Sequence, residues 1–303
     1  MPGQSRFPLP LIAAFFALYV IWGSTYLVIR IGVEYWPPLM LGGIRFVIAG
    51  SLMYAFLRWR GVPAPTWAQW KAAGAIGVLL LSCGNGAVTV AEHTGVTSGV
   101  AALAVATVPL FTLLCGYFWG ARNTRLEWAG IALGMIGIGM LNLGSNLQSS
   151  PLGAGLLLFA AAAWAFGSVW SKHLPLPQGA MASAAEMLVG GVVLLIGSAL
   201  SGERLEAVPP LEGWLALIYL IGFGSIIAFN AYMYLLKHVR PAAATSYAYV
   251  NPAVAVLLGI VFVGETIGLE EALAMVVIIS AVVLIGLPQW RKPKPKAVAQ
   301  ETA

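Results

Sequence analysis

The chain has 303 residues, of which 60% are hydrophobic and only 9% are charged, and its mean hydropathy is +0.87. This balance excludes a soluble globular protein and predicts an integral membrane protein, with the lipid bilayer as its surroundings. The net charge of +5 does not indicate a nucleic-acid partner, because the basic residues lie in short segments between apolar runs and in a tail instead of forming one face.

Ten apolar runs follow one another along the chain, each close to the roughly 20 residues that a helix needs to cross a hydrocarbon core about 30 Å thick. The runs lack the strict alternation of barrel strands, so we expect an all-α fold. The first run is longer than the apolar part of a signal peptide and more spans follow it, which predicts that it is retained. The expected helices cover approximately residues 10–30, 38–58, 69–91, 96–119, 126–144, 152–172, 183–200, 212–236, 241–263 and 269–287.

The distribution of basic residues predicts the orientation of these spans. With the N-terminus in the cytoplasm, thirteen of the sixteen Lys and Arg residues lie on the cytoplasmic side, and the opposite orientation reverses this bias. We therefore expect an inner-membrane protein with both termini in the cytoplasm. Residues 288–303 are basic and contain several prolines, which predicts a disordered cytoplasmic tail near the lipid headgroups.

The two halves of the chain resemble each other at an offset of about 144 residues. At this offset Gly23-Ser24 aligns with Gly167-Ser168, Asn85 with Asn230, and Pro109 with Pro252. Each half contains an odd number of spans, so the second half starts on the opposite side of the membrane and the repeats are inverted, as in many secondary transporters. The sequence thus predicts one five-helix repeat in residues 1–146 and an inverted five-helix repeat in residues 147–287.

Several motifs are missing from the sequence. It contains no aspartate, no phosphate-binding GxxxxGK[ST] loop and no HExxH, and its three histidines flank the ends of spans. An ATP-driven pump needs a nucleotide site, and an enzyme needs a nucleophile with a base or a metal cluster. We therefore expect neither activity, no cofactor and no metal, although a membrane enzyme stays as the least favoured alternative.

Short motifs in several of the spans resemble those of a known family. Trp22-Gly23-Ser24 lies in the first span, Arg45 in the second, Pro109 in the fourth and Asn251-Pro252 in the ninth. Together with the later Gly264-Glu265, they resemble the drug/metabolite transporter superfamily, specifically its ten-helix EamA type. Within this type the chain is most similar to the YddG-type exporters of aromatic and other amino acids. The first half departs from the pattern, with Ala121-Arg122 where Gly-Glu is expected.

The resemblance implies a central cavity lined by the first, third, fourth, sixth, eighth and ninth helices, which opens to either side in turn. Polar side chains inside spans are tolerated where they face protein or water, so polar stripes on one helical face favour lining of this cavity. Hydrogen bonding between packed helices is the alternative for each residue. The candidate substrate-binding residues are Trp22, Ser24, Ser82, Asn85, Thr89, Trp164, Ser168, Asn230, Tyr234, Tyr247, Tyr249 and Asn251.

Prolines and charged residues inside the spans have specific interpretations. Pro109 and Pro252 each remove a helical hydrogen bond near mid-span, which predicts a kink that can act as a hinge. Arg45 lies near the outer surface and is expected to snorkel or to pair with Glu34 or Glu92, while holding a substrate carboxylate is the alternative. Glu186 is expected to snorkel at the cytoplasmic end of its span.

These features predict a secondary transporter that exports amino acids, aromatic ones included, and other small metabolites by alternating access. No glutamate lies near the middle of a span, which predicts uniport-like export with broad specificity; coupling through Glu34, Glu92 or Glu186 stays open. Efflux of aromatic cations or drugs, or of sugar-type metabolites, is the alternative, because aromatic and neutral polar side chains suit both classes. The sequence does not specify an oligomeric state.

Overall fold

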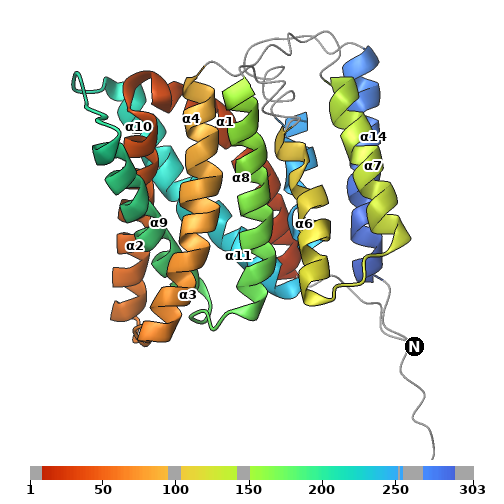
Figure 1. Cartoon of the computed structure of the whole chain (residues 1–303), viewed down its shortest axis with the longest axis horizontal. Coiled ribbons are helices and arrows are strands. Elements are labelled where there is room, and N and C mark those ends of the chain that lie inside the picture. Colours follow the sequence, from red (N-terminus) through yellow and green to blue (C-terminus); the bar gives the residue numbers. More distant parts are fainter. Residues whose placement is uncertain (1–8, 95–103, 142–150, 252, 255–268, 291–303) are drawn as a thin grey trace, which may run out of the picture.

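The computed structural model describes residues 9–94, 104–141, 151–251, 253–254 and 269–290. All regular elements in these ranges are helices, which stand side by side in one bundle (Figure 1). Two shorter apolar helices cover Ala104–Trp119 and Ala272–Pro288. Six described helices are long and apolar enough to cross a membrane: Leu9–Tyr35, Pro38–Trp59, Trp67–Ala91, Leu152–His173, Ala180–Leu200 and Leu211–His238.

The described helices follow the predicted spans. The first five spans contain α1 (Leu9–Tyr35), α2 (Pro38–Trp59), the continuous run of α3 (Trp67–Gly77), η1 (Val78–Gly86) and α4 (Ala87–His93), then α6 (Val108–Gly116) with η2 (Tyr117–Trp119), and α7 (Arg125–Leu141). The second half contains α8 (Pro151–Trp170), η3 (Ser171–His173), α9 (Ala180–Leu200), α10 (Leu211–Tyr219), η4 (Leu220–Phe229), α11 (Asn230–His238), α12 (Pro241–Ala244) and α14 (Leu269–Trp290). Pro252 and residues 255–263 of the predicted ninth span lie outside the described residues.

Capping interactions define where several helices begin. Thr66 and Gln69 form a reciprocal capping box at α3, and Thr124 and Glu127 form one at α7. The N-terminus of α2 receives its acceptors from further away: the Glu203 carboxylate in the α9–α10 connection accepts hydrogen bonds from two of its backbone N–H groups at 3.1 and 2.9 Å. A carboxylate at this position also complements the positive end of the helix dipole.

Two helix pairs pack closely through glycines. The α2 helix lies along α9, where Gly50 faces the Ala184 carbonyl oxygen, and α7 lies along α14, where Gly130 faces the Ala281 carbonyl oxygen (Figure 1). A Cβ atom added at either glycine would lie within about 3.0 Å of that oxygen. Only glycine therefore allows these backbones to approach so closely. Gly130, Gly134 and Gly137 of α7 therefore serve packing within the chain.

The connections between helices lie at two opposite ends of the bundle. Those that join α2 to α3, α6 to α7 and α8 to α9 lie at the lower end in Figure 1, and the connection from α9 to α10 lies at the upper end. The lower connections carry Arg60, Arg122 and Lys172, whereas the upper one carries Arg204. The basic bias read from the sequence is thus concentrated at one physical end of the molecule.

Candidate functional site

A cavity of about 90 Å³ lies inside the bundle, with walls from both halves of the chain. Its lining comes from α1, α2, η1, α4, α6, α8, η4 and the segments around residues 105 and 247–251. These elements belong to the predicted first, third, fourth, sixth, eighth and ninth spans, and α2 adds the second. The polar and aromatic lining residues are Trp22, Thr25, Arg45, Phe46, Asn85, Trp164, Phe229, Tyr247 and Asn251.

Four aromatic side chains pack together beside the cavity. The ring of Trp22 lies edge-on to Tyr247 and Trp164, with centroid distances of 4.8 and 5.5 Å. Tyr232 completes the cluster at 5.2 Å from Trp22, and its hydroxyl accepts a 2.9 Å hydrogen bond from Trp164 Nε1. Edge-to-face aromatic packing and a satisfied indole N–H fix the ring orientations. The cavity therefore has a rigid aromatic wall built by α1, α8, α11 and the segment after α12.

The indole of Trp22 is fixed by a second bond across the bundle. Its Nε1 donates to the Gly224 carbonyl oxygen in η4 at 3.1 Å. The absence of a side chain at Gly224 also makes room for a guanidinium, because a Cβ there would lie 2.8 Å from Arg45 Nη2. This part of η4 thus positions one aromatic and one cationic side chain.

Arg45 lies in the cavity wall and does not snorkel. Only 4% of the residue is exposed, and its Nε donates a 2.7 Å hydrogen bond to Ser225 Oγ. The guanidinium carbon also lies 4.7 Å from the centroid of the Phe46 ring. Among the described residues, the expected ion pair with Glu34 does not form, and the side chain of Glu92, the other expected partner, lies outside the described residues. The expectation failed because α2 turns this side chain inward toward η4, where Gly224 leaves space for it.

Asn251 contributes a polar group without a protein partner. It is 1% exposed and lines the cavity, and neither its Oδ1 nor its Nδ2 has a hydrogen-bond partner among the described residues. A buried amide normally has partners, since leaving such a group unsatisfied costs about 1–3 kcal/mol. Asn251 therefore brings an unsatisfied, shielded amide to the cavity wall.

Five of the twelve residues predicted to bind substrate line the cavity: Trp22, Asn85, Trp164, Tyr247 and Asn251. Among the other seven, the hydroxyl groups of the serines and the threonine form hydrogen bonds within the helical bundle. Ser24 contacts the Tyr219 hydroxyl at 2.7 Å, Ser82 donates to the Gly190 carbonyl, and Thr89 donates to the carbonyl of Asn85 in its own helix. Ser168 contacts the Tyr232 hydroxyl at 2.5 Å and so supports the aromatic wall from behind.

The remaining three predicted residues also lie outside the lining. Asn230 donates to the Ile226 carbonyl at 2.7 Å and contacts the sulfur of Met53. Tyr234 stacks on His238 with a centroid distance of 4.0 Å. Tyr249 is fully buried, packs against Gly134 of α7, and has a hydroxyl without a described partner. In the state that the structure describes, these three side chains contact other protein groups and do not line the cavity.

The backbone is irregular where the cavity forms. A turn at Thr107 interrupts the fourth span, and Pro109 occupies the first turn of α6 directly after it, so the break lies where the hinge was predicted. Both η1 and η4 are π-helical and lie in corresponding spans of the two halves. Wider π turns often occur at functional sites, because they redirect side chains. Sequence periodicity did not reveal these segments.

Glu186 departs from the expectation that it snorkels. It is fully buried within α9, and neither carboxylate oxygen has a hydrogen-bond partner among the described residues. The reason is the close approach of α3, whose Gly77 backbone meets the Glu186 backbone. Glu186 does not line the central cavity.

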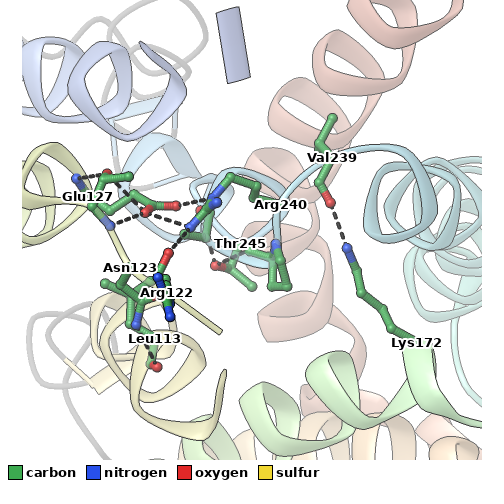
Figure 2. A network of polar contacts seen from close by, with 11 residues as sticks. Leu113, Arg122, Asn123, Glu127, Lys172, Val239, Arg240 and Thr245 are labelled. Carbon is green, nitrogen blue, oxygen red and sulfur yellow. Dashed lines mark hydrogen bonds and ion pairs between the residues drawn. The ribbon is translucent and has the colours of Figure 1, made fainter. Parts of the chain in front are cut away.

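A second pocket of about 400 Å³ lies between the α6–α7 connection and the α11–α12 connection. Figure 2 shows its polar network: Arg240 holds the buried Glu127 carboxylate through Nε at 2.6 Å and Nη2 at 2.9 Å, and Lys172 Nζ donates to the Val239 carbonyl at 2.7 Å. The two-point ion pair joins the two halves of the chain at this end. The pocket is basic, because Glu127 is the only carboxylate among its lining residues, against Arg122, Lys172, Lys237 and Arg240.

Comparisons with known proteins agree with this architecture. The sequence model of the EamA-like transporter family matches residues 9–143 and again residues 151–287. The chain is 57% identical over 291 residues to the "Uncharacterized inner membrane transporter YedA" of Escherichia coli K12, covering 96% of this chain and 95% of the relative. It is 26% identical to a "Probable amino-acid metabolite efflux pump" of Salmonella typhimurium, covering 85% of this chain and 89% of that protein. A solved structure at 21% identity shares the fold, with a TM-score of 0.75 over 93% of this chain and 99% of that one.

Proposed function

Because the chain belongs to the EamA-like transporter family, within the drug/metabolite transporter superfamily, we propose that it exports amino acids, aromatic ones included, and other small metabolites. The observation that carries this proposal is the central cavity, whose walls combine aromatic rings with neutral amides and one cation. Aromatic faces bind apolar side chains, and convergent polar groups orient the backbone atoms of an amino acid. The distant amino-acid metabolite efflux pump supports the same substrate class.

Alternating access is the proposed mechanism. The matches of the family model to residues 9–143 and 151–287 support two repeats of five helices each, at 1–146 and 147–287, and an odd number of helices per repeat makes them inverted. The cavity takes side chains from both repeats, such as Asn85 from the first and Asn251 from the second. Rocking of one repeat against the other would then expose these groups to each side in turn, with the break before Pro109 as a hinge.

Export is proposed to be uniport-like. The cavity lining among the described residues contains no carboxylate that could carry a coupling proton, and the buried Glu186 lies away from it. Carriers driven by protons normally place such a group on the substrate pathway. The substrate's own gradient is therefore the proposed driving force.

The charge of the cavity wall favours amino acids over drug-like cations. The only described charged lining residue of the cavity is the cation Arg45. A cationic drug would be repelled by this group. A neutral sugar could pack a face of its ring on the aromatic wall, but it would leave the charge of Arg45 without a partner.

Counterflow in proteoliposomes tests the proposal. Purified protein would be reconstituted with a high internal concentration of each unlabelled amino acid, and uptake of the labelled compound would be followed. We expect transient accumulation for several amino acids, including phenylalanine or tyrosine, and none for a quaternary ammonium dye or for glucose. Accumulation of only the dye or the sugar would overturn the proposal, and empty liposomes provide the background.

A further inference from the structure

Arg45 is a charge that the described part of the protein does not neutralise. The only ion pair among the described residues joins Arg240 to Glu127, and the one hydrogen bond that the structure gives Arg45 uses its Nε toward Ser225. The Nη groups of the guanidinium are left for other acceptors. Holding a buried cation without an anion is costly, because the charge loses hydration without gaining a partner. A ligand that supplies an anion to this wall would be strongly favoured.

The same cavity presents a second unsatisfied group. Asn251 lines it with a free amide oxygen and a free amide nitrogen, and it comes from the second half of the chain, whereas Arg45 comes from the first. An amide oxygen accepts hydrogen bonds from an ammonium group, and a guanidinium matches the two oxygens of a carboxylate. An α-amino acid carries both groups on one carbon, and its side chain would face the aromatic wall formed with Trp22 and Trp164.

We propose that Arg45 binds the carboxylate of the transported molecule and that a free carboxylate is the feature by which the transporter selects its substrates. Ser225 and Gly224 are positioning residues: the first holds the guanidinium by its Nε, and the second leaves the space that it occupies. The inference rests on the proposed function and narrows it, because amines, amides and esters of the same side chain are then excluded.

The basic pocket between the α6–α7 and α11–α12 connections is consistent with selection for carboxylates. Four cationic side chains and one carboxylate line it, and that carboxylate is already paired with Arg240. Such a pocket raises the local concentration of anions by electrostatic attraction. On the orientation predicted from the sequence it lies at the cytoplasmic end, from which an exporter takes its substrate.

Ligand binding and transport measured on matched compounds test the proposal. The probes are L-phenylalanine, its amide, phenethylamine and 3-phenylpropionate, which share a side chain and differ in the carboxylate and the ammonium group. Each probe would be tested for stabilisation of the purified protein against heat and for competition with phenylalanine counterflow. The variants are Arg45→Gln, Arg45→Lys and, as a control with the same loss of charge at an exposed site, Arg204→Gln.

In the wild type we expect phenylalanine and 3-phenylpropionate to bind and the amide and the amine to fail. Loss of a charge-assisted pair in Arg45→Gln should weaken binding of both carboxylates by about 10-fold to 100-fold. Arg45→Lys should recover part of it, because it restores the charge without the planar fork, and Arg204→Gln should behave as wild type. If Arg45→Gln does not fold, Ser225→Ala provides the second variant. We expect it to bind both carboxylates more weakly than the wild type and, like the wild type, not to be stabilised by the amide.

The outcomes separate this inference from the proposed function. If amino acids are transported but the acid and its amide bind equally well, or Arg45→Gln keeps the wild-type preference, the inference is wrong and the proposed function stands. If no amino acid is transported while 3-phenylpropionate binds in an Arg45-dependent way, the carboxylate site stands and the proposed substrate is wrong. If neither phenylalanine nor 3-phenylpropionate binds the wild type and no amino acid is transported, both are overturned.

Discussion

Trp164 both lines the cavity and packs against neighbouring aromatic rings. Mutation can therefore distinguish it from Asn85, which lines the cavity without such packing. The Trp164 ring lines the cavity, yet it is only 9% exposed, packs on Trp22 and Tyr232 and donates to the Tyr232 hydroxyl. Truncation of a packed tryptophan typically costs about 3–5 kcal/mol, so Trp164→Ala should lose both thermal stability and transport. Asn85 is half-buried at the cavity, so Asn85→Ala should lose transport with near-native melting. Melting curves and counterflow would be recorded on the same preparations; equal melting of the two variants would contradict this assignment.

Glu186 offers a test of coupling at the level of one side chain. Both of its oxygens are buried without described partners, an arrangement that costs about 1–3 kcal/mol for a neutral polar group and more for a charge. Glu186→Gln keeps the shape and removes the ionisable group, so we expect a higher melting temperature at pH 8 and unchanged counterflow.

A proton gradient imposed on the same liposomes completes this test of Glu186. We expect it not to concentrate substrate, since no described carboxylate lines the cavity. Uphill accumulation that a protonophore abolishes in the wild type, and that is lost in Glu186→Gln, would replace uniport by proton coupling through this residue.

Sequence reasoning located the aromatic wall better than the polar contacts. Trp22 and Trp164 lie near the middle of the predicted spans 10–30 and 152–172, whereas tryptophans in membrane proteins usually gather at the interfaces, and both line the cavity. Ser82 and Thr89 shared a helical face with Asn85, but their hydroxyls bond to backbone carbonyls. Polar residues repeat with the same helical period whether they line a cavity or form hydrogen bonds to the backbone, so periodicity alone cannot separate these two roles. The inward turn of Arg45 depends on Gly224, which is far away in sequence and therefore gave no local signal.

At the scale of helices, the close approach of α3 to α9 rests on Gly77. A Cβ at this position would lie 2.2 Å from the Glu186 carbonyl oxygen, closer than any real contact. Gly77→Ala should therefore push the two helices apart and lower the melting temperature strongly. Gly155 in α8 is the matched control, because nothing lies within 4 Å of its added Cβ, and Ala there should gain up to about 1 kcal/mol of helix propensity. Similar melting of the two variants would mean that this helix contact contributes little.

The positions of the helices could be predicted, but not their internal irregularities. Runs of apolar residues long enough for a membrane identify α1, α2, α8 and α9 directly. The π-helical segments η1 and η4 each contain two glycines and a serine, but glycine is also frequent in regular membrane helices, so this composition did not identify a π-helix. Both segments contribute residues to the cavity wall, Leu81, Gly84 and Asn85 from η1 and Gly224 and Phe229 from η4.

For the whole molecule, the arrangement of connections makes the predicted orientation testable at several places at once. The α2–α3, α6–α7 and α8–α9 connections share one end of the bundle, so cysteines placed in them must all report the same side of the membrane (Figure 1). The exposed residues Arg60, Ala121 and Gln178 provide these positions, and Ser149 provides one in a connection predicted to be periplasmic. The two native cysteines, Cys83 and Cys115, are free and half-buried, and would be replaced by serine.

In intact spheroplasts, an impermeant maleimide should label Ser149→Cys and leave Arg60→Cys, Ala121→Cys and Gln178→Cys unlabelled, because the end rich in Lys and Arg is retained in the cytoplasm. Permeabilised cells should label all four and so control for reactivity. The reverse pattern would invert the orientation and place the basic pocket outside, where it would attract anions for import instead of export. A mixed pattern among the three clustered positions would contradict the arrangement of the helices itself, since the bundle holds them at one end.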